Sequence, residues 1–288
     1  MYNENIRRLD DLIRKIEISI MEHSSDNSYP KDYMNKLLEY LKLIKKEKGN
    51  IPNISATFAL NWKNKNITNI EESLNIERTI VEKRGAQRYY YLISLEDYNG
   101  RPILISGRPD GVKFMKDENE SKSVYNKVEI IEVKSSGILS KIFKNNVKLD
   151  DLELQKIIYR QILLIGLREQ LIFYQYLFEK TSKYSLINNV KKIDLYGYVA
   201  LYLEEEYLEQ LYKVKNKIIN NLEKIESYLS KFGVHISGLS EINRNPINKN
   251  KIYYFTIIVK VDYNKKVAMD YLKSLFSILD RIEIARNL

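Results

Sequence analysis

The stretch VEIIEV at residues 128–133 is the feature that most constrains the fold of this chain. Its apolar run is too short for a helix and is typical of a buried strand. Buried strands of this kind occur in sheets whose faces are covered by helices. The rest of the chain therefore has to supply both neighbouring strands and covering helices.

The periodicity of apolar residues predicts both kinds of element. Residues 4–22 and 33–44 have helical spacing and predict a helical hairpin, which Gly49 and Pro52 end. The following elements are expected after it: a helix from Thr68 or Asn69 to residue 84, two strands around an Asn99–Gly100 turn, a short strand at 110–115, the strand at 128–133, a helix at 152–167, a strand at 193–203, a helix at 204–231 stopped by Gly233, a strand at 252–261 and a helix at 265–284.

This order predicts an α/β fold with a mixed β-sheet flanked by helices. The N-terminal helical hairpin and the C-terminal strand and helix are additions to that core. A boundary near residue 50 divides the hairpin (1–50) from the main domain (51–288), and we expect the hairpin to pack on the core.

The composition of the chain favours a polyanionic partner and excludes the kinds of site that need cysteine. Among the 288 residues, 47 Lys and Arg outnumber 38 Asp and Glu, and a net charge of +9 favours a polyanionic partner such as nucleic acid. The absence of cysteine excludes disulfides, thiolate zinc sites and cysteine-ligated iron–sulfur clusters. No apolar stretch approaches the ~18 residues of a spanning helix and no signal peptide is visible, so we expect a cytoplasmic protein with no membrane partner.

Three residues combine into a candidate metal site. Asp110 lies in the turn GRPDG, where Gly111 permits an unusual backbone angle, and the strand before the turn delivers Asp110 beside Glu132 if the two strands pair. Glu132 and Lys134 project to one face of their strand because side chains alternate. Two carboxylates and the Val133 carbonyl would suit Mg²⁺ or Mn²⁺. The alternatives are a solvated strand end and an ordinary turn, both common in a chain that is 30% charged.

The order of these motifs resembles the PD-(D/E)xK nuclease superfamily, over roughly residues 55–205. Helix 152–167 contains QKIIY, in which Gln155 and Tyr159 are similar to the Q-x-x-x-Y element of the RecB- and Cas4-like branch. The resemblance implies a restriction-endonuclease-like core, with Asp110 and Glu132 holding the ion and Lys134 assisting the attacking water. It also implies that Gln155 and Tyr159 position the nucleic-acid strand.

Two departures from the family are visible. Cas4-like members carry cysteines that bind an iron–sulfur cluster, and this chain has none, so no such cluster is expected. Family members often place a metal-binding histidine before the first strand, but His23 and His235 lie far from the motifs. A glutamate can take that place. Glu77 is nearest the centre of the apolar stripe of helix 69–84, whereas Glu71 is closer to the family position and is equally suited to cap the helix.

Basic residues near the motifs are candidates for sequence-neutral phosphate contacts, or are simply solvated. They are Arg108, Lys141, Lys144, Lys148, Arg160 and Arg168.

We therefore predict a Mg²⁺- or Mn²⁺-dependent deoxyribonuclease, more specifically an exonuclease of DNA processing, repair or viral or CRISPR-related metabolism. A structure-selective or nicking endonuclease on the same fold is the alternative within enzymes. A non-catalytic DNA-binding or assembly protein is the alternative outside them. The expected partners are single- or double-stranded DNA, with a homo-oligomer or DNA-processing proteins as further partners. No Walker, Rossmann, H-E-x-x-H or G-x-S-x-G motif supports another chemistry.

Overall fold

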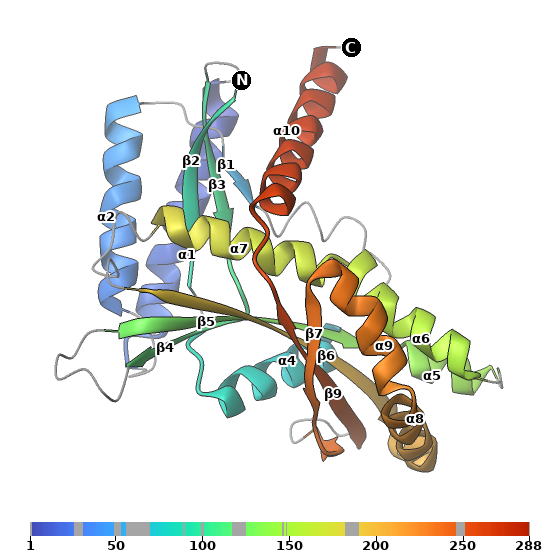
Figure 1. The fold of residues 1–288 in the computed structure, drawn as a ribbon. Helices are drawn as coiled ribbons and strands as arrows, with labels where there is room; N and C mark the ends of the chain where they lie inside the picture. Colours follow the sequence, from blue (N-terminus) through green and yellow to red (C-terminus); the bar gives the residue numbers. More distant parts are fainter. Residues whose placement is uncertain are drawn as a thin grey trace.

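A six-stranded mixed β-sheet lies at the centre of the computed structural model (Figure 1). Its main path is β4-β5-β6-β9-β7, and β8 pairs with β9. β5 and β6 are parallel and the other pairs are antiparallel, so the predicted α/β fold with a mixed sheet is confirmed. The strands are β4 (Gly111–Lys116), β5 (Tyr125–Ser136), β6 (Lys192–Glu204), β7 (Val234–Leu239), β8 (Asn243–Arg244) and β9 (Ile252–Val261).

The structure describes most of the chain. The described residues are 2–25, 31–48, 53–55, 70–88, 90–98, 101–116, 125–145, 147, 149–181, 190–245 and 251–287. Several predicted features lie outside them: Gly49, Pro52, Thr68, Asn69, the Asn99–Gly100 turn and Lys148.

Helices cover both faces of the central sheet, as the apolar run of β5 requires. On one face, Val128 and Ile130 belong to the large core that includes α7 (Leu167–Thr181). On the other face, Ile131 and Val133 pack with α4 (Ile70–Arg84). Because side chains alternate along the strand, Glu132 and Lys134 lie on the α7 side of β5.

A second, three-stranded sheet connects the N-terminal hairpin to this core. It contains β1 (Asn53–Ser55), β2 (Leu92–Tyr98) and β3 (Arg101–Gly107) in the order β1-β3-β2. Ile93 and Leu104 are buried against the hairpin, whereas Leu92 and Ile105 are buried in the main core. The hairpin consists of α1 (Tyr2–Glu22) and α2 (Lys31–Lys48) and packs on this sheet, while the division into domains at residue 50 stays a prediction.

Two predicted helices are interrupted. The helix expected at 152–167 is α6 (Asp151–Tyr159) followed by a π-helical turn (Arg160–Leu164), and Gly166 then adopts a φ of +84° before α7 begins. The helix expected at 204–231 is divided into α8 (Leu208–Asn220) and α9 (Leu222–Leu229), flanked by 3₁₀ turns at Glu205–Tyr207 and Ser230–Phe232. Gly233 ends it with a φ of +67°, as predicted.

The helix α7 is the largest element that the sequence did not predict. Eleven of its fifteen residues are buried, so its sequence lacks the one-sided apolar stripe by which amphipathic helices are recognised. β1, β7 and β8 were also not predicted. α5 (Ile138–Lys144) follows β5, and α10 (Lys265–Asn287) completes the chain and packs on α7 (Figure 1).

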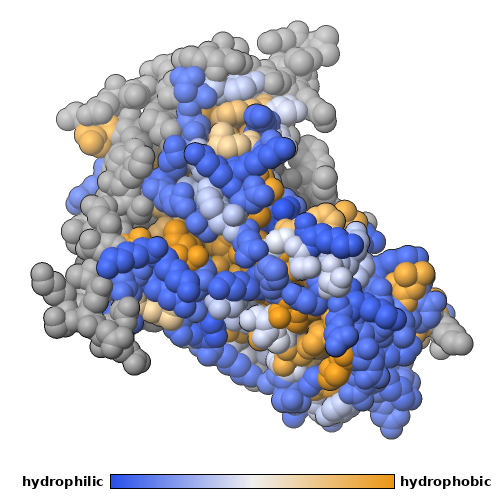
Figure 2. Space-filling view, viewed as in Figure 1, coloured by the Kyte–Doolittle hydropathy of each residue, from blue (hydrophilic) through white to orange (hydrophobic). Residues whose placement is uncertain are grey.

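The outer surface is mostly hydrophilic on the face shown in Figure 2, with apolar areas separated by polar side chains. Within the described ranges, no helix combines the length and the apolar composition needed to cross a bilayer.

The surroundings of the Asp194 carboxyl group indicate that the stability of the protein depends on pH. The Asp194 carboxylate is buried on β6, and the Nζ atoms of Lys127 and Lys260 each lie 2.9 Å from it. Burial opposes its ionisation, but the hydrogen bonds from the two lysines outweigh burial and lower its pKa below 3.8. A carboxyl group with a lowered pKa stabilises the fold above its unfolded-state pKa, and this stabilisation is lost as the pH falls through the folded-state value.

We therefore expect Asp194→Asn to lower the free energy of unfolding by about 1–3 kcal/mol at neutral pH, because charge-assisted hydrogen bonds are lost. Urea denaturation at neutral pH and near pH 3 measures this difference, which should shrink at the lower pH. Asp270→Asn, on the exposed face of α10, is the matched control and should have little effect. An equal loss of stability at both pH values would contradict the role of the Asp194 charge.

Candidate active site

Asp110 lies at an open edge of β5. β4 pairs with β5 only as far as the Gly111–Ile131 pair, whereas β6 stays paired with the other edge of β5 as far as Ser136. Asp110 precedes Gly111, so it continues this register opposite Glu132, and its Oδ2 accepts a hydrogen bond of 2.8 Å from the Val133 N–H. The N–H and C=O of a strand residue point to the same edge, so the Val133 carbonyl also faces this side.

Two expectations about this turn are corrected. The strand before Asp110, β3, pairs with β1 and β2 and not with β5; the strand that follows, β4, brings Asp110 to Glu132. Gly111 does not have a positive φ. Its small size is needed instead, because a Cβ atom there would lie 2.8 Å from Val81 and 3.0 Å from Ala86. The glycine therefore lets α4 approach the beginning of β4.

Lys134 is held by a chain of hydrogen bonds that joins β5 to α7 (Leu167–Thr181). Its Nζ lies 2.5 Å from Glu132 Oε1 and 2.9 Å from Gln170 Oε1. The Gln170 amide in turn donates to the Tyr174 hydroxyl at 2.5 Å, and Tyr174 donates to the Arg108 carbonyl at 3.1 Å. The chain therefore ends in the same turn that carries Asp110. Gln170 and Tyr174 form a second Q-x-x-x-Y sequence, QLIFY, fifteen residues after QKIIY.

Gln155 and Tyr159 are not brought to Lys134. They line a pocket against α9 (Leu222–Leu229), and no residue of β5 lines it. The Tyr159 ring packs at 4.3 Å from the Tyr228 ring. The prediction that Gln155 and Tyr159 lie beside Lys134 is therefore wrong, and a glutamine and a tyrosine of the same spacing on α7 take that position. The only signal in the sequence was the repetition of the spacing at Gln170, which lies beyond the predicted end of the helix.

Glu77 reaches the same edge from the opposite face of the sheet. Its Oε1 accepts a hydrogen bond of 3.1 Å from the Ser135 hydroxyl, on the side of β5 that packs against α4. Burial raises the pKa of Glu77, and the nearby charge of Asp110 raises it further. The helical-wheel preference for Glu77 therefore agrees with its position, whereas the side chain of Glu71 lies outside the described residues.

The carboxylates of Glu77, Asp110 and Glu132 repel one another. Burial raises the pKa of Glu132, and the charges of Asp110 and Glu77 add to this effect. Burial alone would lower the pKa of Lys134, but the adjacent Glu132 and Asp110 carboxylates outweigh it and raise that pKa. Lys134 is therefore a stable cation, whereas the raised pKa values of Glu77 and Glu132 favour the protonated forms of these two carboxyl groups.

The donor atoms at this edge are chemically suited to a hard divalent cation. Glu132 is 3% exposed, and its Oε2 is buried without a hydrogen-bond partner in the described part of the chain. The described residues contain no set of three acidic or histidine side chains already arranged as ligands. Asp110 accepts from the Val133 N–H and Glu132 Oε1 is paired with Lys134, so an ion would have to use Glu132 Oε2 or displace these contacts.

The two histidines of the chain have other surroundings. His235 is hydrogen-bonded to Glu226 and Asp262, and His23 follows α1 in the hairpin. Neither histidine takes part in the contacts described for the site.

Two of the predicted phosphate-binding residues are bonded within the protein, and three others are exposed. Lys144 is paired with Glu204, and Arg168 bonds to Glu169 and to the Phe232 carbonyl. Lys141 and Arg160 are exposed. Arg108 is also exposed, in the turn beside Asp110, with its guanidinium 5.9 Å from the Tyr91 ring centroid. Arg108 is therefore the basic residue of this group closest in sequence to the site.

Comparisons of this chain with protein-family models, with curated proteins and with solved structures gave no match in any of the three. The resemblance to the PD-(D/E)xK superfamily stays a prediction.

If this site binds a divalent ion, we expect the ion to stabilise the folded protein. An ion that binds only the folded state should raise the unfolding temperature by about 5–10 °C when free Mn²⁺ exceeds its Kd about 100-fold. Asp110→Asn should abolish this rise because it removes a negatively charged ligand, and Asp270→Asn should retain it. Thermal unfolding monitored by circular dichroism, with EDTA as the metal-free reference, measures the effect. A rise of the same size in Asp110→Asn would contradict a metal site at this edge.

Proposed function

We propose that this protein is a Mg²⁺- or Mn²⁺-dependent deoxyribonuclease with a restriction-endonuclease-like core, and more specifically an exonuclease. One observation carries the proposal: Lys134 contacts both Glu132 and Gln170 beside Asp110, so an acid pair, a lysine and a Q-x-x-x-Y helix meet at one edge of the sheet. These groups come from three segments far apart in sequence. Carboxylates that hold a divalent ion, with a cation beside them, can promote the hydrolysis of a phosphodiester.

Asp110, Glu132 and the Val133 carbonyl are the proposed ligands of the ion, with Glu77 completing the oxygen-rich site. The bound ion would supply a Lewis acid for the phosphate and would lower the pKa of a water molecule. The raised pKa values of Glu77 and Glu132 reflect burial and repulsion between neighbouring carboxylates, and a divalent cation would relieve this repulsion and take the place of the bound protons.

Lys134 acts in this proposal as a hydrogen-bond donor and a positive charge. Its raised pKa keeps it protonated at neutral pH, so it is unsuited to remove a proton from water. Its ammonium group can orient the attacking water and stabilise the negative charge that develops on the phosphate. The side chain is 21% exposed, which leaves part of it accessible to a substrate.

Gln170 and Tyr174 are positioning residues for Lys134 in this proposal, replacing Gln155 and Tyr159. Gln170 is buried and can hold the ammonium group in a single direction, because its own amide is fixed by the Tyr174 hydroxyl. Tyr174 also contacts the turn before Asp110 through the Arg108 carbonyl. The same two side chains thus link the lysine to the acid-bearing turn.

Replacing Lys134 tests the proposed chemistry. Lys134→Ala should lower the cleavage of end-labelled linear DNA in Mg²⁺ or Mn²⁺ by about 100-fold or more, because a preorganised charge is lost. EDTA should abolish cleavage by the wild type. Lys213→Ala, an exposed lysine of α8, is the matched control and should retain activity.

Covalently closed circular DNA in the same assay separates the possible activities. An exonuclease leaves it intact, whereas a nicking endonuclease converts it to the relaxed form. Full activity in folded Lys134→Ala would contradict the proposed chemistry. The absence of cleavage in wild type, together with unchanged DNA binding in Lys134→Ala, would identify a non-catalytic DNA-binding protein.

The second prediction separates the two Q-x-x-x-Y sequences. Gln170→Ala should lower kcat for cleavage by about 10- to 100-fold because Lys134 loses its orienting partner. Gln155→Ala removes the same side chain at the same spacing and should leave kcat nearly unchanged. Steady-state cleavage rates, with unfolding temperatures as a check of folding, test the pair. A larger loss of kcat in Gln155→Ala than in Gln170→Ala would show that QKIIY, and not QLIFY, positions Lys134.

A further inference from the structure

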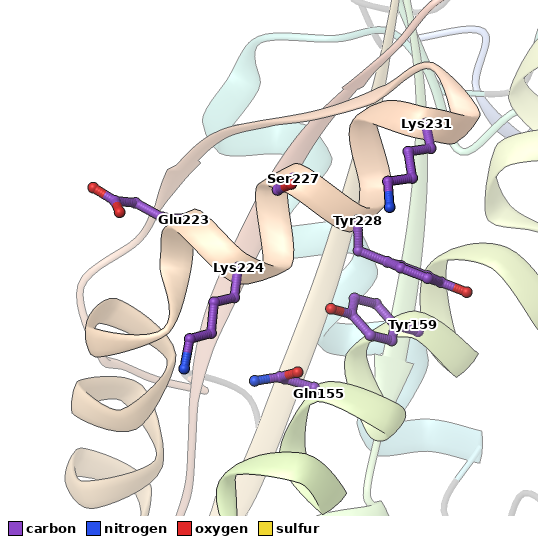
Figure 3. Close-up of a pocket in the computed structure, with 7 residues that line it drawn as sticks. All are labelled: Gln155, Tyr159, Glu223, Lys224, Ser227, Tyr228 and Lys231. Atoms are coloured by element: carbon purple, nitrogen blue, oxygen red, sulfur yellow. The ribbon is translucent and has the colours of Figure 1, made fainter.

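A pocket of about 600 Å³ lies between α6 and α9, apart from the carboxylate site (Figure 3). It is open to solvent, and its walls combine aromatic, basic and amide side chains. The lining residues are Gln155, Tyr159, Glu223, Lys224, Ser227, Tyr228 and Lys231. None of them belongs to the proposed active site.

A row of three aromatic rings begins in this pocket with Tyr159 and Tyr228 and continues to Phe232, which lies outside the lining. The ring centroids of Tyr159 and Tyr228 are 4.3 Å apart, and those of Tyr228 and Phe232 are 5.4 Å apart. Tyr228 is 40% exposed and Phe232 is 38% exposed, although aromatic rings of this size are usually covered. Arg168 donates to the Phe232 carbonyl at 2.7 Å, which ties the end of the row to the beginning of α7. The row is therefore a preformed aromatic surface in contact with solvent.

Two lysines accompany the aromatic row. Figure 3 shows Lys224 and Lys231 pointing from the α9 segment toward the side of the pocket that holds Gln155 and Tyr159, whereas Glu223 points away. The Lys231 ammonium lies 6.0 Å from the centroid of the Tyr228 ring.

Across the described part of the chain, neither Lys224 nor Lys231 has a carboxylate within ion-pair distance. This differs from Lys215 and Lys217 on the preceding helix α8, which are paired with Glu241 and Asp151. Two positive charges that have no carboxylate partner among the described residues therefore lie beside exposed aromatic rings.

We propose that this pocket binds a segment of single-stranded nucleic acid, with a base stacked on Tyr228 and backbone phosphates at Lys224 and Lys231. A ligand for this surface must present both flat rings and negative charge. The bases of a single strand offer their ring faces, whereas those of a duplex are covered by their neighbours. The Gln155 amide supplies both a donor and an acceptor at the edge of a base, which fits binding without a preference for one base.

This proposal goes beyond the nuclease activity and does not depend on it. Binding here requires no metal and no carboxylate, because the proposed contacts are stacking and phosphate pairing. The pocket therefore constitutes a second contact site for a strand, and it can be measured with the active site kept free of metal.

Fluorescence anisotropy with a labelled oligothymidylate of about twelve nucleotides, in EDTA, tests the proposal. Tyr228→Ala should weaken binding about tenfold, because one stacked base loses its partner. Tyr228→Phe keeps the ring and should retain the affinity of the wild type. Replacing both Lys224 and Lys231 with Ala should reduce the slope of log K against log salt by about 1.4, as two phosphate contacts are lost.

The matched controls lie on α8. Tyr212 is 52% exposed and Lys213 next to it is also exposed, and both are outside the pocket. Tyr212→Ala and Lys213→Ala should each bind the oligonucleotide as the wild type does. Asp110→Asn should also retain binding in EDTA, which separates failure of this proposal from failure of the nuclease proposal. Each variant is first compared with the wild type in its unfolding temperature.

Three results would overturn the proposal. The first is unchanged affinity in folded Tyr228→Ala, and the second is an equal loss in Tyr212→Ala. The third is equally effective competition by blunt duplex DNA or by polyglutamate of similar length, which would identify a general surface for polyanions.

Discussion

The contact of the Lys134 ammonium with the buried Glu132 carboxylate is the interaction on which the candidate site depends. A buried carboxylate without a partner would take up a proton, because burial disfavours its charged form. Lys134 stabilises the charge on one oxygen of Glu132 and leaves Oε2 without a partner in the described chain. The same ammonium group bonds to Gln170, so the ion pair also attaches the end of β5 to α7. One cation thereby serves both the electrostatics of the site and the packing of two elements.

The geometry of the sheet explains why three carboxylates meet at this place. β5 continues beyond the last residue that β4 pairs, which exposes a short length of strand edge between the two helical layers. Asp110 occupies the edge itself through its bond to the Val133 N–H. Glu77 approaches from the α4 face and Glu132 from the α7 face. A site built around a strand edge can collect groups from both faces, whereas a site in the middle of a sheet cannot, because the sheet separates them.

The break between α6 and α7 separates the candidate active site from the pocket between α6 and α9. The π-helical turn and Gly166 end α6, and the chain then enters the core as α7. α7 brings Gln170 and Tyr174 to Lys134, while α6 presents Gln155 and Tyr159 to α9 at the surface. π-helical turns are rare and are frequent at functional sites. We propose that the carboxylate site binds the scissile phosphate and that the pocket between α6 and α9 binds a single-stranded segment.

The sequence by itself determined the parts of the site that depend on local geometry. Alternation along a strand forces Glu132 and Lys134 to one face, and the helical wheel favours Glu77 over its neighbours. The mixed sheet covered by helices also followed from short apolar runs between helical patterns. Only the tertiary structure decided which strand brings Asp110 to Glu132 and which helix meets Lys134. Both depend on contacts between distant segments, and the spacing of glutamine and tyrosine is the same in α6 and α7. The helix that contacts Lys134 is the one buried nearly all round, and such a helix shows no one-sided pattern in its sequence.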